Sequence, residues 1–527
     1  MLVIVSDLHL TDGTAGSTVE SGAFEIFAER VRELAVAASW RSDGRYRPIE
    51  RIDLVLLGDI LDVVRSAQWA AVPGVRPWGN SLAPEFVDQV TRITTGILRR
   101  NEKGLAVLRG LTAEGGVTVP PVIYARAGAE ADAQGEPVQV RLHYMVGNHD
   151  WYFHLADRKF DPLRQKIVQA LGLANPFDQP FPHDMTENEE LLAAMRRHKV
   201  TARHGDLFDP LNFEGDRDAA SLGDVIVIEL VNRFAAEVET QLAGDLPAST
   251  VLGLREIDNI RPILLVPVWI DGLLERTCAF PGMRKRVKAV WDRMVDEFLG
   301  IEFVRRRDTI SPVDVVDGLQ RALRFSKRFS IGWASAITEW LNKIRGSETS
   351  SYCTHALAEQ DFRNRRSRHI VYGHTHLAET VALDASYAEG YVLHQEYFNT
   401  GTWRRIHRQT QLAPAEHEFI AQDVMSYAVF YQGDERRGRP YETWNGTLGF
   451  NPCDVPIHRV DPGQTVIQRA PGSVQAAAPA SSKACIPLAA KQPPAPSRHG
   501  FGPHFLRKNL RPAAAPPRLM GLDNQDQ

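Results

Sequence analysis

The sequence predicts an α/β fold of packed layers, with a large, mainly helical insertion near the middle of the chain. Three features predict it. Short apolar runs of strand length recur, and segments with helical spacing of apolar residues lie between them. Strands that alternate with helices are typical of layered α/β folds rather than of all-β folds. Each apolar run ends in polar residues, and open sheets commonly bind ligands at the carboxyl ends of their strands.

Five apolar runs are predicted to be buried strands. They cover residues 2–5, 53–57, 138–146, 199–203 and 370–372. In the same order, they lead into Asp7 and His9, Gly58-Asp59, Asn148-His149-Asp150, His204, and His374 and His376.

Helical periodicity is clear in residues 23–38 and 84–100. The second of these segments lies within residues 66–137, which are otherwise rich in Gly, Ala and Pro. We therefore expect residues 66–137 to form an elaborated surface insertion.

Local signals mark two further helices. Asp161 followed by Pro162 indicates a helix start, and Gly172 indicates its end. Thr186 and Glu189 match a capping box ahead of a short apolar helix.

Composition narrows the function classes. The chain has 527 residues, of which 61 are basic and 65 acidic, for a formal net charge of −4. This balance gives no reason to expect nucleic-acid binding, which usually requires a basic excess. The four cysteines are scattered without CxxC pairing, which is typical of a reducing compartment. Because no signal peptide and no bilayer-spanning stretch of about 20 apolar residues is evident, we expect a cytoplasmic protein.

The polar residues after the strands form a candidate metal site. Carboxylates, imidazoles and one amide oxygen suit borderline divalent ions, with Mn²⁺ the first choice and Fe²⁺, Zn²⁺ or Ni²⁺ the alternatives. Seven ligands are too many for one tetrahedral ion, but they fit two ions about 3.5–4 Å apart. The candidate ligands are Asp7, His9, Asp59, Asn148, His204, His374 and His376.

Taken singly, each motif has a simpler interpretation as a turn, a helix cap or a core histidine. Taken together, five such coincidences in a row are needed to explain the motifs away. The other histidines are interpreted as structural: His143, His154, His183, His198, His355, His369 and His394.

The ordered motifs resemble the signature of the calcineurin-like metallophosphoesterase family. The resemblance covers about residues 1–209 and 356–410, and each motif follows a predicted strand. It implies a four-layer α/β/β/α sandwich whose discontinuous catalytic domain comprises residues 1–209 and 356–465. Residues 210–355 would be a helix-rich insertion or lid, and the Ala/Pro-rich residues 466–527 a disordered tail.

The resemblance also implies a role for each ligand. One metal would be held by Asp7, His9, Asp59 and His376. The second would share Asp59 and be held by Asn148, His204 and His374. A hydroxide bridging the two ions would attack phosphorus, with His149 as the catalytic histidine that donates a proton to the leaving oxygen. Asp150 is expected to orient His149, with Asp62 as a further hydrogen-bonding partner of the site.

Several segments are also similar to the UDP-2,3-diacylglucosamine pyrophosphatase branch of the family, including residues 6–10, 58–62 and 397–403. That branch implies a phosphorylated small-molecule or nucleotide-lipid substrate. It typically carries arginine where this chain has His149, and its members are about half as long. The alternatives are a metal-dependent nuclease and a non-catalytic scaffold of the same fold.

The insertion bears on the expected partners. It mixes apolar side chains with a basic run, which is compatible with covering an acyl chain or touching an anionic membrane surface. The competing interpretation is a helical lid that packs on its own core. The apolar side chains concerned are Trp269, Ile270, Leu273, Leu274 and Phe298.

Overall fold

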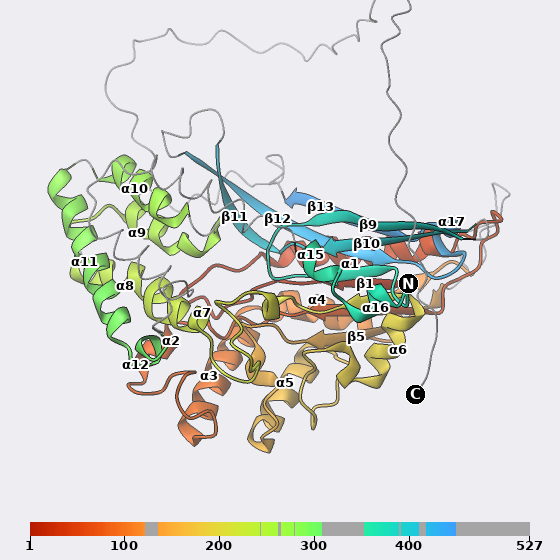
Figure 1. The fold of residues 1–527 in the computed structure, drawn as a ribbon, viewed down its shortest axis with the longest axis horizontal. Coiled ribbons are helices and arrows are strands. Elements are labelled where there is room, and N and C mark those ends of the chain that lie inside the picture. Colours follow the sequence, from red (N-terminus) through yellow and green to blue (C-terminus); the bar gives the residue numbers. More distant parts are fainter. Residues whose placement is uncertain are drawn as a thin grey trace, which may run out of the picture. The chain divides into compact units, whose positions relative to one another are not determined.

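Two mixed β-sheets and the helices around them carry an α/β fold (Figure 1). The computed structural model describes residues 1–121, 135–242, 244–261, 265–278, 280–307, 352–388, 391–410 and 418–448. The expected tail at 466–527 and the second part of the insertion, residues 308–351, lie outside the described residues.

The larger sheet is built around β1. This strand runs parallel to β2, which runs parallel to β5, and β12 lies antiparallel on the other side of β1. Its strands in spatial order are β5 (Gln139–Met145), β2 (Arg51–Leu57), β1 (Leu2–Val5), β12 (Phe419–Phe430), β11 (Arg404–Gln409) and β7 (Ile260–Arg261), with β13 (Tyr441–Leu448) also paired to β12.

The smaller sheet holds the two remaining predicted strands. Its order is β6 (Val200–Ala202), β8 (His369–Tyr372), β10 (Tyr391–Asn399) and β9 (Glu379–Ala388). The first three are parallel, and β9 is antiparallel to β10. A separate pair, β3 (Thr118–Val119) and β4 (Glu136–Pro137), forms a short hairpin-like ladder. All five strands predicted from the sequence are confirmed.

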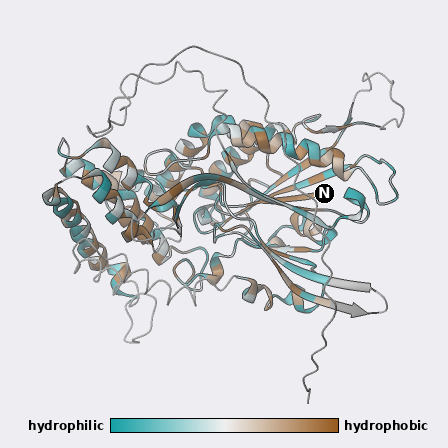
Figure 2. Cartoon of the chain, turned by 90° about the horizontal axis from the view of Figure 1, so that it is seen from above, coloured by the Kyte–Doolittle hydropathy of each residue, from teal (hydrophilic) through white to brown (hydrophobic). Residues whose placement is uncertain are grey.

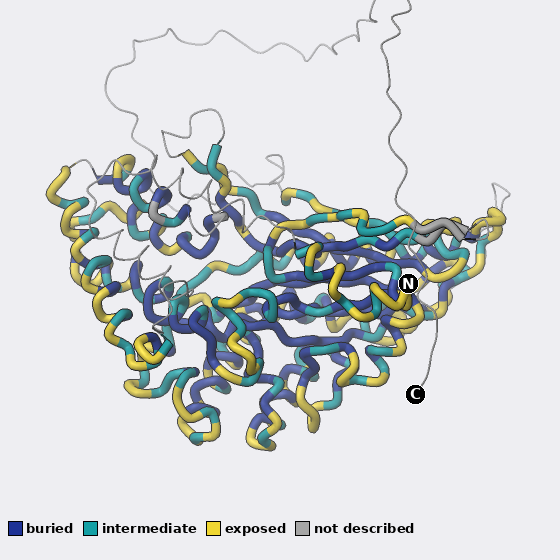
Figure 3. The backbone as a smooth tube through the Cα atoms, in the orientation of Figure 1, coloured by how far each residue is buried: buried dark blue, intermediate teal, exposed yellow. Residues whose placement is uncertain are grey.

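Alternation along β1 explains how its two faces are used. Leu2 and Ile4 are fully buried in a hydrophobic cluster that also contains Val371 and Phe398 of the smaller sheet. Val3, on the opposite face, lies in a second cluster with helix residues. The strands therefore form the buried centre, and hydrophobic residues run along them (Figures 2 and 3).

Helices cover the outer face of the larger sheet. They are α1 (Ser21–Ala38), α2 (Gln68–Ala71), α3 (Pro84–Arg100), α4 (Glu102–Thr112) and α5 (Asp161–Leu171). The helices predicted at 23–38, at 84–100 and after Asp161 are confirmed, and Gly172 ends α5 in the left-handed region with φ 70°. The expectation of a surface insertion at 66–137 is wrong for α3, because Val90, Ile93 and Ile97 are fully buried in the core.

The capping box predicted at Thr186 is also wrong. Helix α6 (Glu189–Arg197) is capped by Asn188, whose side chain accepts a hydrogen bond from Leu191 N. Thr186 lies instead in a 3-10 turn that Asp184 caps. Two short helices, α15 (Cys353–Ala356) and α16 (Gln360–Arg363), precede β8.

The described part of the insertion, residues 210–307, is mainly helical and has its own hydrophobic cluster. Its helices are α7 (Leu222–Val225), α8 (Asn232–Gln241), α9 (Ala248–Arg255), α10 (Val266–Thr277), α11 (Pro281–Gly300) and α12 (Glu302–Arg305), with a π-helical turn at Ile226–Val231. Trp269, Leu273, Leu274 and Phe298 are buried in this cluster. Trp269 also contacts the rings of His407 in β11 and Phe419 in β12, so these four side chains pack within the insertion and against the larger sheet.

Buried polar contacts join the insertion to the larger sheet. Arg404 of β11 donates to Asp258 and Asn259, each at 2.6 Å, and Arg65 donates to Asn232 at 2.6 Å. Within the described ranges, no helix combines the length and apolar character needed to cross a membrane. Helix α17 (Glu435–Gly438) precedes β13, and β13 is the last element that the structure describes.

Candidate metal centre

The seven predicted ligands come from loops that follow five different strands, and the structure brings all of them together. Four form one group in which the ligand atoms lie within 4.8 Å of one another: Asp7, His9, Asp59 and His376. A second group contains Asp59 again, with His204 and His374. The seventh, Asn148, places its Oδ1 3.2 Å from His204 Nε2. Asp59 is therefore common to both groups.

The first group is tightly gathered and buried. The two Nε2 atoms of His9 and His376 are 2.9 Å apart, and His376 Nε2 is 3.2 Å from Asp7 Oδ1. His9 Nε2 also lies 3.7 Å from Asp59 Oδ2. Two imidazole nitrogens and two carboxylates thus converge on one point, which is the ligand chemistry of a borderline divalent cation.

Asp59 links this group to the second. Its Oδ2 lies 3.2 Å from His204 Nε2, and its Oδ1 accepts a hydrogen bond of 2.8 Å from the backbone N–H of His149. Asp59 is only 1 % exposed. The carboxylate is consequently fixed in a position from which one oxygen can serve both ligand groups.

The backbone conformation of the ligand loops is unusual. Positive φ angles of 45–67° occur at Asp7, His9, Asp59, His374 and His376. Left-handed backbone is uncommon for residues other than glycine and costs free energy, and it clusters at functional sites. Five of the seven predicted ligands adopt this left-handed conformation. The loops therefore accept an unfavourable backbone conformation that directs the ligand side chains towards one another.

Two glycines make room for this arrangement. A methyl group added at Gly58 would lie 2.5 Å from His204 Nδ1, and one added at Gly373 would lie 2.6 Å from Asp7 Oδ2. Either contact is far closer than atoms tolerate. Glycine is therefore needed before Asp59, where His204 approaches closely, and before His374, where Asp7 approaches closely.

Asp62 fixes two of the histidines. Its Oδ2 lies 2.8 Å from His9 Nδ1, and its Oδ1 lies 2.7 Å from His149 Nδ1. Oδ1 also accepts a hydrogen bond from Arg65 N at 2.9 Å. Since Nδ1 of each ring is held by the carboxylate, Nε2 is the nitrogen that can take a metal or a substrate.

The expected orienting role of Asp150 is wrong. Its carboxylate is fully buried and accepts hydrogen bonds from Ile60 N at 2.8 Å, Gly147 N at 2.6 Å and Tyr144 Oη at 2.6 Å. Asp150 therefore braces the two loops that carry Asp59 and Asn148, while Asp62 contacts His149.

Asp209 is a site residue that the sequence analysis missed. Its Oδ2 lies 3.0 Å from His374 Nε2, and it also accepts from Asn212 Nδ2 at 2.8 Å. The same Asn212 accepts from Asn148 Nδ2 at 3.2 Å. Asp209 does not directly follow a strand, because the 3-10 turn Asp206–Phe208 separates it from His204 and the end of β6. The pattern of polar residues after strands therefore does not predict it.

The loop after β10 supports Asp7 from behind. Thr402 Oγ1 donates to Asp7 O at 2.6 Å, and Trp403 N donates to the same oxygen at 3.1 Å. Ser6 Oγ hydrogen-bonds Asp7 Oδ2, whereas the buried Asp7 Oδ1 faces the Nε2 atoms of His376 at 3.2 Å and of His9 at 3.8 Å. Burying an ionised oxygen is costly unless positive charge lies beside it, and a cation bound among these three side chains would supply that charge.

The electrostatics of the site follow from its burial and its mixed charges. Burial raises the pKa of Asp59, but His204, His149 and His9 outweigh it and hold this pKa below its ordinary value. Burial lowers the pKa of His204, but Asp59 and Asp7 outweigh it and raise this pKa to about 10. The carboxylates are thus ionised at neutral pH, and divalent cations that bind His204 would displace its proton.

A scan of protein-family models found none that matches this chain, and a search of curated proteins found no significant match. The site's own residues therefore carry the functional argument.

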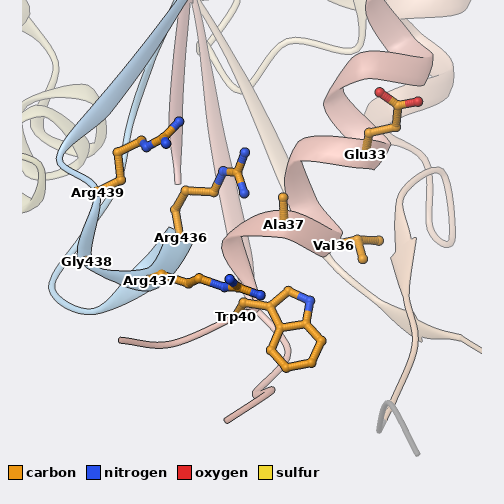
Figure 4. A pocket seen from close by; sticks show the side chains of 8 residues that line it. All are labelled: Glu33, Val36, Ala37, Trp40, Arg436, Arg437, Gly438 and Arg439. Carbon is orange, nitrogen blue, oxygen red and sulfur yellow. The ribbon is translucent and has the colours of Figure 1, made fainter. Parts of the chain in front are cut away.

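A separate pocket of about 740 Å³ contains none of these ligands. Arg437 lies over the Trp40 ring there, 5.6 Å from its centroid, and Arg436 and Arg439 line the same pocket at the turn before β13 (Figure 4). Arg436 and Arg439 both form ion pairs with Glu442, which offsets their charge.

Proposed function

We propose that this protein is a binuclear metal-dependent phosphoesterase that hydrolyses a phosphoester or pyrophosphate bond. One observation carries the proposal: two groups of ligand atoms, each gathered within 4.8 Å, share the single carboxylate of Asp59. A carboxylate shared in this way could bridge two metals at the separation of about 3.5–4 Å that is usual for two-metal hydrolytic sites.

The donor set fits two such ions. It combines three carboxylate or amide side chains with four imidazoles, and it directs the buried Asp7 Oδ1 towards the Nε2 atoms of His9 and His376. Divalent ions bound there would make water more acidic and offset the charge on phosphoryl oxygens. Mn²⁺ is the first choice for this oxygen- and nitrogen-rich set, and Fe²⁺, Zn²⁺ and Ni²⁺ are the alternatives.

His149 is the residue that would act on the substrate in this proposal. It lies beside the first group, with its ring centroid 4.8 Å from that of His9, and its side chain is 14 % exposed. Because Asp62 holds Nδ1, Nε2 is the atom that would donate a proton to the leaving oxygen. This role needs a partly exposed ring, unlike the fully buried ligand His204.

The packing supports the four-layer α/β/β/α sandwich that the family resemblance implies. One hydrophobic cluster lies between the two sheets, and a second joins the larger sheet to α1, α3, α4 and α5. A third joins β8 and β10 to Ala356 and its neighbours in α15.

The test is hydrolysis of an aryl phosphomonoester and an aryl phosphodiester by the purified full-length protein with added Mn²⁺. We expect metal-dependent release of the phenolate, and its loss in Asp59→Ala. The matched control is Asp43→Ala, which removes an exposed carboxylate that contacts Arg45 rather than a ligand. A protein that binds metal but hydrolyses neither compound with Mn²⁺, Fe²⁺, Zn²⁺ or Ni²⁺ would favour a scaffold and contradict the proposal.

A further inference from the structure

We propose that His154, His183 and Asp218 form a third divalent-metal site, separate from the seven ligands above, that takes one zinc-like ion. From the sequence alone, both histidines are predicted to be structural. Their arrangement with a carboxylate is what changes that interpretation.

The three side chains come together from segments distant in sequence. Asp218 Oδ1 lies 2.6 Å from His154 Nδ1 and 3.5 Å from His183 Nε2. The ring centroids of the two histidines are 4.3 Å apart, and the ligand atoms of all three residues lie within 4.8 Å. Two imidazoles and one carboxylate, with a fourth position left for water, are a common zinc ligand set.

His183 supplies the observation that points to a ligand. The residue is 3 % exposed, and both of its ring nitrogens are buried without a hydrogen-bond partner. A buried imidazole of this kind needs an explanation, because unpaired buried polar atoms are rare and destabilising. Its Nε2 is directed towards Asp218 but lies too far away for a good hydrogen bond.

Glu187 completes the environment of a metal ligand. Its Oε2 lies 3.3 Å from His154 Nε2, on the side of the ring away from Asp218. The same oxygen accepts a hydrogen bond from His183 N at 3.0 Å. Metal-binding histidines usually donate their other ring N–H to a carboxylate, and Glu187 occupies that position.

The site would tie together two segments that meet at the candidate metal centre. His154 follows Asn148 by six residues, and Asp218 follows Asn212 by six residues. Asn148 and Asn212 already contact each other at 3.2 Å. An ion bound by His154 and Asp218 would hold the same two segments at a second point, so it positions the loop that carries Asp209.

The test measures zinc per chain in the full-length protein after chelator treatment, loading with Zn²⁺ and removal of unbound metal. We expect three equivalents in the wild type and two in Asp218→Asn. The side chain of Asp218 is 39 % exposed, so this substitution should leave folding intact; circular dichroism checks it. The matched control is Asp216→Asn, an exposed carboxylate two residues earlier that accepts a hydrogen bond from Asp218 N, which an asparagine oxygen can also accept, and it should retain three.

The third site is distinguishable from the proposed function. Asp59→Ala should lose zinc from the binuclear centre but keep one equivalent, and Asp59→Ala combined with Asp218→Asn should keep none. His183→Ala should behave like Asp218→Asn. Equal zinc content in the wild type and Asp218→Asn would overturn the proposal, because it would mean that water or the ion pair alone fills this cluster.

Discussion

Replacing Asp62 with asparagine tests how the site orients its ligands. Arg65 N donates to Asp62 Oδ1, so the amide oxygen of asparagine should take the Oδ1 position. The amide NH₂ would then face His9 Nδ1, 2.8 Å from the present Oδ2. An N–H donor there forces the His9 proton onto Nε2, the nitrogen that faces Asp7, Asp59 and His376. A protonated Nε2 cannot bind a metal.

The expected magnitude follows from this geometry. Outer partners of metal-binding histidines typically contribute about 10–100-fold to metal affinity, or about 1.4–2.8 kcal/mol. Asp62→Asn should fall in that range, because it affects one ligand of the first group. Its contact with His149 should survive, since the oxygen at Oδ1 can still accept.

The assay is a calorimetric titration of the chelator-treated protein with Mn²⁺. Asp53→Asn is the matched control, because Asp53 is also buried on the larger sheet but pairs with Arg51 and Arg197 rather than with a ligand. We expect weaker binding in Asp62→Asn and unchanged binding in Asp53→Asn. Equal affinities in Asp62→Asn and the wild type would refute the orienting role of Asp62.

Three further predictions follow from other contacts. His149→Ala should keep both metals but lower turnover about 100- to 10,000-fold, whereas Asp59→Ala should lose metal as well; elemental analysis beside kinetics separates the two. Asp209→Asn should lower metal affinity about 10–100-fold through His374, and unchanged Mn²⁺ binding would contradict this. Burial raises the pKa of Asp53, but its histidine and arginine neighbours outweigh burial and hold it below the ordinary value. Because the pKa of Asp53 is lower in the folded chain than in the unfolded chain, the ionised carboxylate adds to the free energy of unfolding above a pH of about 4. This contribution is lost as the pH falls below that value. Asp53→Asn should therefore lower the free energy of unfolding at pH 7 by about 2 kcal/mol, and the difference in urea denaturation should narrow in acid.

The strand ends were predictable from the sequence because one physical rule covers them. A buried strand in a parallel arrangement reads as an apolar run, and its polar residues follow at the carboxyl end. All seven predicted ligands obey this rule, as Asp7 after β1 and His204 after β6 illustrate. The ligands lie close together because the strands that precede them pair in parallel, β1 with β2 and β2 with β5 in one sheet, and β6 with β8 in the other.

Features set by tertiary contact were not predictable in this way. Helix α4 contains Gly104 and Gly110, which disfavour a helix. Gly104 is needed there because a methyl group in its place would lie 2.7 Å from Phe24 of α1. Asp209 contacts His374 because a turn follows β6, and no pattern in the sequence predicts that contact. His154, His183 and Asp218 lie in three separate segments and form a cluster only in the folded chain.

The most direct test of the account is anomalous diffraction from crystals of the full-length protein grown with Mn²⁺. We predict two peaks about 3.5–4 Å apart, one beside Asp7, His9 and His376, the other beside His204 and His374, with Asp59 between them. No peak within bonding distance of Asp59, or these side chains found dispersed, would contradict it.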